Sequence, residues 1–224
     1  MGDSKVKIDG LSFCIRSSGA RDKFLAFCIQ SIHALRIEIP YEVLVYGHTG
    51  LESNQYAFTL IEGRDDALNA RYGKMLNKLA EKAQFSFIVY LDDDSQLFPF
   101  WWDQVQKLDF ADFDLTPFKL YQVRREQDKF EDWYDWAEVI PGKSVLKSWT
   151  EPANDRTYIG TGALIVRREV VLKVRFDEFH GGGEDSKFSF ECFKQGYRLR
   201  AYPFMRHAIC IHFLVQEGRN AFKL

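Results

Sequence analysis

The stretch that decides the fold is Phe85-Ser86-Phe87-Ile88-Val89-Tyr90-Leu91-Asp92-Asp93-Asp94-Ser95. Its first part is rich in β-branched and aromatic residues, which predicts a buried strand over 85–91. The consecutive aspartates that follow repel one another, and burying them is costly unless a cation neutralises them. Oxygen ligands favour Mg2+ or Mn2+ over zinc. The run is therefore a candidate metal site that serves a phosphate, and an acidic turn is the alternative.

Strands and helices alternate in the chain before this run. Apolar patterns predict strands over 11–15, 41–46 and 57–61, and helices over 23–35 and 66–83. Such alternation implies right-handed crossovers and an α/β fold, with a mixed, mainly parallel, Rossmann-like sheet flanked by helices. Ligands bind at the carboxyl ends of the strands in such sheets. Ser17, Gly47 and the aspartate run all follow strand ends, which strengthens the metal interpretation.

The second half has a less regular pattern. We expect helices over 100–110, 168–176 and 184–195, and strands over 114–121, 158–166, 197–202 and 208–213. A Gly160-Thr161-Gly162 kink interrupts the strand over 158–166. The stretch 122–149 is polar and aromatic without a clear period, and long irregular segments are usually functional or mobile. No linker or repeat divides the chain, so we expect one domain over 1–224.

Composition excludes several classes of protein. The 224 residues include 30 basic and 32 acidic side chains, and the net charge of -2 argues against nucleic-acid binding. No apolar stretch has membrane-spanning length, and residues 1–5 lack the apolar region of a signal peptide. The cysteines, Cys14, Cys28, Cys192 and Cys210, have no metal-binding spacing, and we interpret them as buried free thiols. We therefore expect a cytoplasmic protein.

The order of these motifs resembles the inverting glycosyltransferases of family 2, which have the GT-A fold of nucleotide-sugar enzymes. Asp92-Asp93-Asp94 after a core strand is similar to the DXD motif of that family. Gly73 and Asn77 resemble its glycine- and asparagine-containing helix before the motif. The segment with Gly160-Thr161-Gly162, the later Gly182-Gly183-Glu184-Asp185 and the last strand with His212 resemble its second half. The combination of order and spacing is more specific than any single motif.

The resemblance implies a metal site and a catalytic base. Asp94 would bind Mn2+ or Mg2+, Asp92 or Asp93 would hold the ribose or the metal through water, and His212 would complete the ligands. A core histidine satisfied by a carbonyl is the alternative for His212, and His207 and His180 are weaker substitutes. Asp185 would accept the proton of an acceptor hydroxyl and Glu184 would orient a sugar hydroxyl. Alternatively, both acids only cap the helix that they begin.

The resemblance also assigns a nucleotide-sugar site. Its expected residues are Ser17, Gly47, His48, Asp66, Lys74, Asp92, Asp93, Gly160, Thr161 and Gly162. His48 stands where the family often has the aspartate that reads uracil, so Asp65 or Asp66 is a substitute. Leu76 replaces the arginine that the family has beside Asn77. Tryptophan faces suit sugar rings, so Trp101, Trp102, Trp133 and Trp136 form a candidate stacking platform, with core packing as the alternative.

We therefore expect a metal-dependent inverting transferase that moves a hexose or N-acetylhexosamine from a UDP-sugar to an acceptor hydroxyl. Residues 1–95 would form the nucleotide-binding half and 96–224 the acceptor and catalytic half. The acceptor class is not specified, although 122–149 and 180–183 should contact it. The rivals are a nucleotidyltransferase, a non-catalytic nucleotide- or carbohydrate-binding module on the same fold, and a glycoside hydrolase, which needs two facing carboxylates and no metal.

Overall fold

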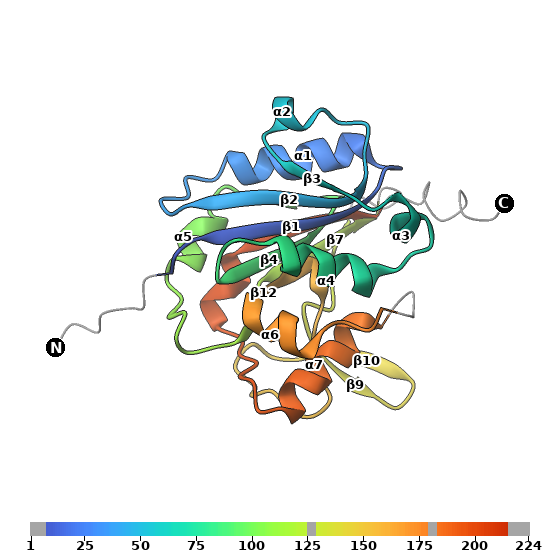
Figure 1. Ribbon diagram of the computed structural model, residues 1–224. Coiled ribbons are helices and arrows are strands. Elements are labelled where there is room, and N and C mark those ends of the chain that lie inside the picture. Colours follow the sequence, from blue (N-terminus) through green and yellow to red (C-terminus); the bar gives the residue numbers. More distant parts are fainter. Residues whose placement is uncertain (1–7, 125–128, 179–182, 215–224) are drawn as a thin grey trace.

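A six-stranded sheet with the order β3-β2-β1-β4-β12-β6 forms the centre of the computed structural model (Figure 1). The structure describes residues 8–124, 129–178 and 183–214. Neighbouring strands from β3 to β4 are parallel, whereas β12 is antiparallel to both β4 and β6. The sheet consists of β3 (Thr59–Glu62), β2 (Tyr41–His48), β1 (Leu11–Ser18), β4 (Phe87–Asp92), β12 (Leu164–Arg167) and β6 (Leu115–Pro117).

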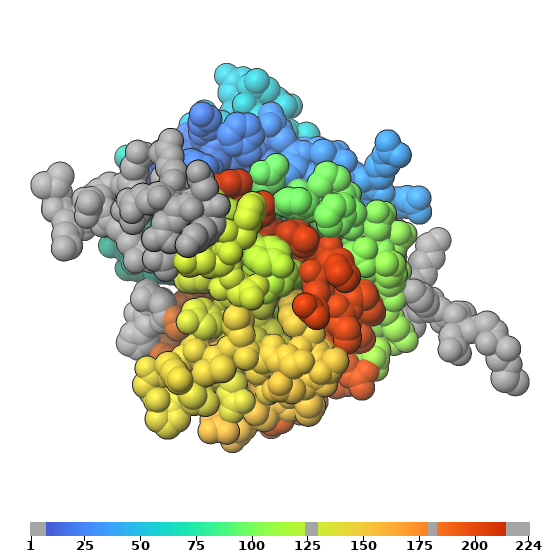
Figure 2. Space-filling view, turned by 180° about the vertical axis from the view of Figure 1, so that it is seen from behind, coloured from blue at the N-terminus to red at the C-terminus, as the bar shows by residue number. Residues whose placement is uncertain are grey.

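The remaining strands form two smaller sheets. One has the order β5-β13-β7-β8, and the other has the order β10-β9-β11. In Figure 2 the yellow to orange residues of the second sheet and its surroundings cover the lower part of the face. The strands are β5 (Ser95–Leu97), β7 (Lys119–Arg124), β8 (Lys129–Asp132), β9 (Trp136–Ile140), β10 (Lys143–Leu146), β11 (Thr157–Ile159) and β13 (Ile209–Leu214).

Helices cover both faces of the central sheet because its strands are apolar on both sides. Successive residues of β1 and β4 point to opposite faces. The helices are α1 (Asp22–His33), α2 (Ser53–Tyr56), α3 (Arg64–Leu68), α4 (Tyr72–Lys82), α5 (Trp101–Val105), α6 (Arg168–Val174) and α7 (Glu184–Lys194), with short 3-10 turns η1 (Thr161–Ala163) and η2 (Pro203–His207). None of the described helices is long and apolar enough to cross a membrane.

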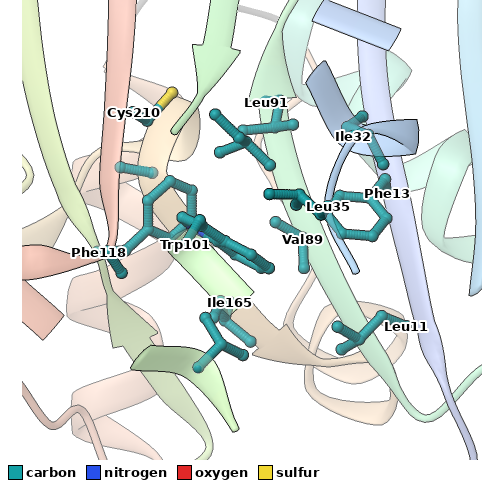
Figure 3. Packing of buried hydrophobic residues seen from close by; sticks show 14 of the residues in the cluster. Leu11, Phe13, Ile32, Leu35, Val89, Leu91, Trp101, Phe118, Ile165 and Cys210 are labelled. Atoms are coloured by element: carbon teal, nitrogen blue, oxygen red, sulfur yellow. The ribbon is translucent and has the colours of Figure 1, made fainter. Parts of the chain in front are cut away.

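The core therefore divides into two clusters, one on each face. Phe13 and Val89 pack with α1, α5 and the β5-β13-β7 strands, whereas Cys14 and Tyr90 pack with α4, α6 and α7. Figure 3 shows the first cluster, in which strand residues point toward Trp101 and Phe118. The same alternation places Arg16 and Asp92, which are register partners at the carboxyl ends of β1 and β4, on the α4 face.

The structure corrects several expected elements. The helix predicted over 66–83 is two helices, α3 and α4, because Ala70 adopts a positive φ of 50° between them. The irregular stretch 122–149 contains β8, β9 and β10, whose short strands and partly exposed faces gave no clear period. The strand expected over 114–121 is divided into β6 and β7, and η1 divides the one expected over 158–166. Residues 197–202 form only an isolated bridge, between Leu199 and Leu115.

The cysteine prediction is confirmed. Cys14, Cys28, Cys192 and Cys210 are all buried free thiols. Burial raises the pKa of each of them, so each is held as a neutral thiol. They act as small apolar groups in the core rather than as metal ligands.

Candidate active site

The aspartate run lies where the central sheet meets the β5-β13-β7-β8 sheet. Asp92 ends β4, and Ser95 begins β5, which pairs with β13. In the pairing of β5 with β13, Ser95 is opposite His212. Asp94 directly precedes Ser95, in the turn that joins β4 to β5, and therefore lies close to the histidine. His212 Nε2 lies 2.8 Å from Asp94 Oδ1 and 3.9 Å from Asp92 Oδ2.

Asp92, Asp94 and His212 form a candidate metal site. Each offers one ligand atom, and these atoms lie within 4.8 Å of one another. Asp94 is 1% exposed, and its Oδ1 accepts no aligned hydrogen bond from the described residues. Two carboxylates and an imidazole suit Mn2+, and a carboxylate-rich site also suits Mg2+. The residues present therefore fit a hard divalent cation.

Gly162 allows the backbone of η1 to approach Asp92. A Cβ atom at this position would lie 2.8 Å from Asp92 Oδ2, and any larger side chain would occupy the space at that oxygen. Gly160 and the buried Thr161 precede it, and a Cβ at Gly160 would lie 2.8 Å from the carbonyl oxygen of Tyr134. Gly162 thus packs against Asp92, whereas Gly160 packs against the backbone of Tyr134.

Arg16 joins the aspartate run to the Glu184-Asp185 pair. Its Nε donates to Asp92 Oδ1 over 2.8 Å, and its Nη1 donates to Glu184 Oε1 over 2.9 Å. The guanidinium also lies over the ring of Tyr72, 4.4 Å from the ring centroid. Burial lowers the pKa of Arg16, but the two carboxylates outweigh that effect and raise it overall. Conversely, burial raises the pKa of Asp92, but Arg16 and His212 lower it overall.

A second arginine contacts the rest of the run. Arg21 Nη1 lies 3.3 Å from Asp93 Oδ1 and forms an ion pair with Asp94 Oδ2. Even so, burial raises the pKa of Asp93 to about 7, and the charges of Asp94 and Asp92 add to that rise. Burial also lowers the pKa of His212, but the adjacent carboxylate of Asp94 and the charge of Asp92 outweigh it, so the pKa is raised.

The Glu184-Asp185 pair begins α7, where the helix dipole favours acidic groups. Glu184 is 5% exposed and its carboxylate is paired with Arg16. Burial, and then the charge of Glu184, raises the pKa of Asp185 to about 6. The amide of Ser186 donates to Asp185 Oδ1 over 2.7 Å. The N-cap residue of α7 is Gly183, which has no side chain to cap the helix. Gly181, Gly182 and His180 lie outside the described residues.

The nucleotide-site candidates fall into two groups. Ser17, Gly47 and His48 lie side by side at the ends of β1 and β2, where Ser17 pairs with Gly47. Gly47 is required there, since its φ is 127° and a Cβ would lie 1.9 Å from the carbonyl oxygen of Ser17. Asp66 and Lys74 form a separate ion pair of 2.7 Å, and the hydroxyl of Tyr46 also donates to Asp66.

Several expected side chains lie elsewhere. Trp101, Trp102 and Trp136 are buried in the core, so the tryptophan platform is wrong for these three residues. Trp133 is half-buried, and its ring centroid lies 6.3 Å from that of His212. His207 is exposed on η2 and is not part of the candidate metal group.

The sequence reasoning missed Arg16, Arg21 and Gln122. Gln122 on β7 is the register partner of His212 and is fully buried, and neither polar atom of its side chain has a hydrogen-bond partner among the described residues. A usable signal existed for Arg16, which directly follows an apolar strand at the same sheet edge as the aspartate run. No such signal exists for Gln122, because its position depends on the pairing of β7 with β13.

Comparison with known proteins identifies the fold. No protein-family model and no curated protein matches the sequence. Among solved structures, residues 1–349 of S. aureus TarS in complex with UDP match with a TM-score of 0.63 and 16% identity over 95% of this chain. The same segment with UDP-GlcNAc matches with a TM-score of 0.63 and 15% identity over 92% of this chain. GalNAc-T7 with UDP, GalNAc and Mn2+ matches with a TM-score of 0.71 and 14% identity over 94%.

These matches show the GT-A fold of glycosyltransferases, as the sequence motifs predicted. The chain covers 62% and 59% of the two TarS structures and 45% of GalNAc-T7, so it spans less than two thirds of each neighbour.

Proposed function

We propose that this chain is a metal-dependent inverting glycosyltransferase that moves a hexose or N-acetylhexosamine from a UDP-sugar to an acceptor hydroxyl. The observation that carries the proposal is Arg16, which is ion-paired with both Asp92 and Glu184. One guanidinium therefore holds Asp92 of the candidate metal group together with Glu184, the residue next to the candidate base Asp185. The GT-A fold, and the UDP and UDP-GlcNAc in the structural neighbours, support a UDP-sugar as the donor.

Asp92, Asp94 and His212 would hold Mn2+ or Mg2+. When bound, the ion supplies positive charge that stabilises the leaving diphosphate. The chain contributes a buried carboxylate, Asp94, and a glycine, Gly162, that leaves space at Asp92 Oδ2. The Mn2+ in the GalNAc-T7 structure supports this assignment.

Asp185 would be the base that accepts the proton of the acceptor hydroxyl. A carboxylate with a pKa of about 6 is ionised at neutral pH and is more basic than an ordinary aspartate. The hydroxyl oxygen then attacks the anomeric carbon as its bond to the diphosphate breaks, and the proton moves to the Asp185 carboxylate. Attack from the side opposite the leaving group inverts the anomeric configuration. Glu184, held by Arg16, would orient the reacting sugar rather than accept the proton.

The nucleotide would bind at the carboxyl ends of β1 and β2, in the half formed by residues 1–95. Ser17, Gly47 and His48 line this edge. Asp66 is the candidate to contact the uracil, and Lys74, its ion-pair partner, is the candidate to face the diphosphate. The Gly160-Thr161-Gly162 backbone would approach the donor near Asp92. Residues 96–224 would supply the catalytic acids and the acceptor contacts, with the half-buried Trp133 as the remaining candidate for sugar stacking.

The alternatives make different use of the same residues. A nucleotidyltransferase would need the aspartate run but not a base with a raised pKa at Asp185. A non-catalytic binding module would bind UDP without transferring sugar. Asp185 has a raised pKa and directly follows Glu184, which is paired with Arg16. This combination favours a transferase.

A donor screen tests the proposal directly. UDP-, GDP- and CMP-sugars are incubated with the protein and Mn2+, and release of nucleotide is measured. We expect release from a UDP-sugar, inverted configuration in the transferred sugar, and loss of activity on chelation with EDTA. Retained configuration contradicts the inverting mechanism, and UDP binding without release or transfer supports the non-catalytic alternative.

Two variants separate the two parts of the site. Asp94→Ala should abolish Mn2+-dependent UDP binding, and Asp185→Asn should keep donor binding but lower transfer by at least about a hundredfold. Asp155→Asn is a matched control, because the Asp155 side chain is 76% exposed and lies away from the aspartate run in sequence. If Asp185→Asn retains near-normal transfer, Asp185 is not the base.

A further inference from the structure

Arg21 has a position that the proposed reaction does not by itself explain. It is the N-cap residue of α1, and Nη1 of its side chain contacts both Asp93 and Asp94. The Arg21 side chain is 28% exposed, whereas those of Asp93 and Asp94 are 8% and 1% exposed. A largely buried pair of carboxylates is therefore neutralised in part by a side chain that can reach solvent.

The contacts of Asp94 place Arg21 in competition with a divalent cation. Arg21 engages Asp94 Oδ2, and His212 lies beside Oδ1, so both oxygens of the carboxylate have a basic partner. A divalent cation on Asp94 would lie close to the guanidinium, and like charges repel strongly where water is scarce. Arg21 must therefore weaken metal binding for as long as it stays on Asp94.

The Arg21 side chain also has donor capacity that the described residues do not use. Its Nε is buried and has no hydrogen-bond partner among them. A buried unpaired donor costs free energy, which a ligand with acceptor oxygens would recover. The planar guanidinium matches phosphate oxygens in two-point geometry. The N-terminus of the 12-residue α1 directly after Arg21 adds positive potential at the same place.

We propose that Arg21 is an exchangeable counter-cation, which holds Asp93 and Asp94 before metal binds and transfers its hydrogen bonds to the diphosphate of the donor afterwards. This inference rests on the proposed function. It gives Arg21 two opposite effects, since the residue weakens binding of the metal alone and strengthens binding of the nucleotide to the metal-loaded protein. Arg21 thereby makes binding of the metal and of the donor depend on each other.

The test measures the two affinities separately. Mn2+ is titrated into the metal-free protein and free Mn2+ is followed by electron paramagnetic resonance; UDP is then titrated at saturating Mn2+ by calorimetry. In Arg21→Gln we expect the Kd for Mn2+ to fall about tenfold, the size of effect that one nearby charge has on proton binding to a carboxylate. The Kd for UDP should rise by about tenfold or more, as expected for losing charge-assisted hydrogen bonds.

Two further variants control for charge and folding. Lys23→Gln removes an exposed positive charge from the same helix, and both affinities should stay unchanged. Arg21→Lys keeps the positive charge but cannot donate two parallel hydrogen bonds as a guanidinium does. Its Mn2+ affinity should therefore stay near that of the wild type, and its UDP affinity should lie between those of the wild type and Arg21→Gln. Circular dichroism verifies that each variant is folded.

The outcomes distinguish this inference from the proposed function. If wild-type protein binds no Mn2+, the proposed metal site is wrong and the role of Arg21 is wrong with it. If wild-type protein binds Mn2+ and UDP but Arg21→Gln binds Mn2+ no more tightly, only the role of Arg21 is overturned. Unchanged UDP affinity in Arg21→Gln would show a structural ion pair and would likewise overturn it.

Discussion

Arg16 connects two acidic groups that are far apart in the sequence. Its side chain is 19% exposed, and those of its partners Asp92 and Glu184 are 18% and 6% exposed. Because all three charges are mostly shielded from water, removing the arginine leaves two carboxylates without compensation. Arg16 therefore has a structural role in addition to the one that we propose for it in the site.

Replacing Arg16 should destabilise the protein. We expect Arg16→Met to lower the free energy of unfolding by about 3 kcal/mol, because it leaves buried charges unpaired. Urea unfolding measures this. Lys78→Met is the matched control, since Lys78 and its partner Glu81 are 42% and 32% exposed, and it should cost less than about 1 kcal/mol. Equal losses in the two variants would contradict a special role for Arg16.

The pKa of Asp185 predicts a pH dependence of the reaction. The proposed base must be ionised to act, and the pKa of Asp185 is raised to about 6, so kcat/KM should fall as the pH drops through that value. The same shift means that the folded state binds this proton more tightly than the unfolded state. The protonated Asp185 side chain therefore contributes to the stability of the fold, and this contribution is lost as the pH rises from 3.8, the ordinary pKa of an aspartate, to about 6.

A pH–rate profile measures the first effect. The acidic limb near pH 6 should disappear in Asp185→Asn, leaving a low and flat rate. If the acidic limb persists unchanged in that variant, a group other than Asp185 causes the fall in rate. Asp155→Asn should keep both the rate and the limb, because its side chain is exposed.

Among the elements, α4 is held unusually close to the chain after α6. Asn77 donates to the carbonyl oxygen of Phe176 and accepts from the Phe176 amide, each over 2.9 Å, and it also donates to Glu178. A Cβ at Gly73 would lie 1.8 Å from the carbonyl oxygen of Asp177. The motif pair Gly73 and Asn77 thus packs two segments together and makes no contact with the aspartate run through these bonds.

This packing predicts an effect opposite to helix propensity. Alanine is favoured over glycine inside a helix by about 1 kcal/mol, so propensity alone would make Gly73→Ala stabilising. The overlap with the Asp177 backbone should instead make it destabilising by about 2 kcal/mol. Urea unfolding decides between the signs, and an increase in stability would show that the two segments can separate. Lys78→Ala on the exposed side of α4 should change stability by no more than about 0.5 kcal/mol.

At the scale of the whole molecule, the site draws on both ends of the chain. Arg16 comes from β1, Asp92 from β4, Glu184 from α7 and His212 from β13. A ligand that contacts these elements together binds the folded state only. Binding should therefore stabilise the entire fold rather than one segment.

Thermal unfolding tests this linkage. At saturating Mn2+, UDP at about 100 times its Kd should add about 2.7 kcal/mol of stability. For a chain of this size that corresponds to a rise in Tm of about 5–10 °C. Asp94→Ala should show no rise with the same additions. A Tm that is unchanged in the wild type would contradict a nucleotide site built from both halves.

The sequence by itself determined the sheet and the edge at which the candidate site lies. Apolar runs with β-branched residues specify buried strands, and their alternation with helices specifies a parallel sheet whose carboxyl edge binds ligands. This pattern places Asp92 at that edge, whereas Glu184 and His212 could be proposed as parts of the same site only through the resemblance of their motifs to a known family. Local pattern failed where strands were short or half-exposed, as over 122–149, and where the break at Ala70 divided a helix.

Only the tertiary structure decided how the charges are paired. Arg16 reaches Asp92 and Glu184, Arg21 reaches Asp93 and Asp94, and Gln122 lies beside His212, all across strands or helices distant in the sequence. The physical reason is that a side chain's partners depend on strand register and on which face of the sheet it occupies. A one-residue slip would reverse that face, and periodicity within one segment carries no information about the register of the next.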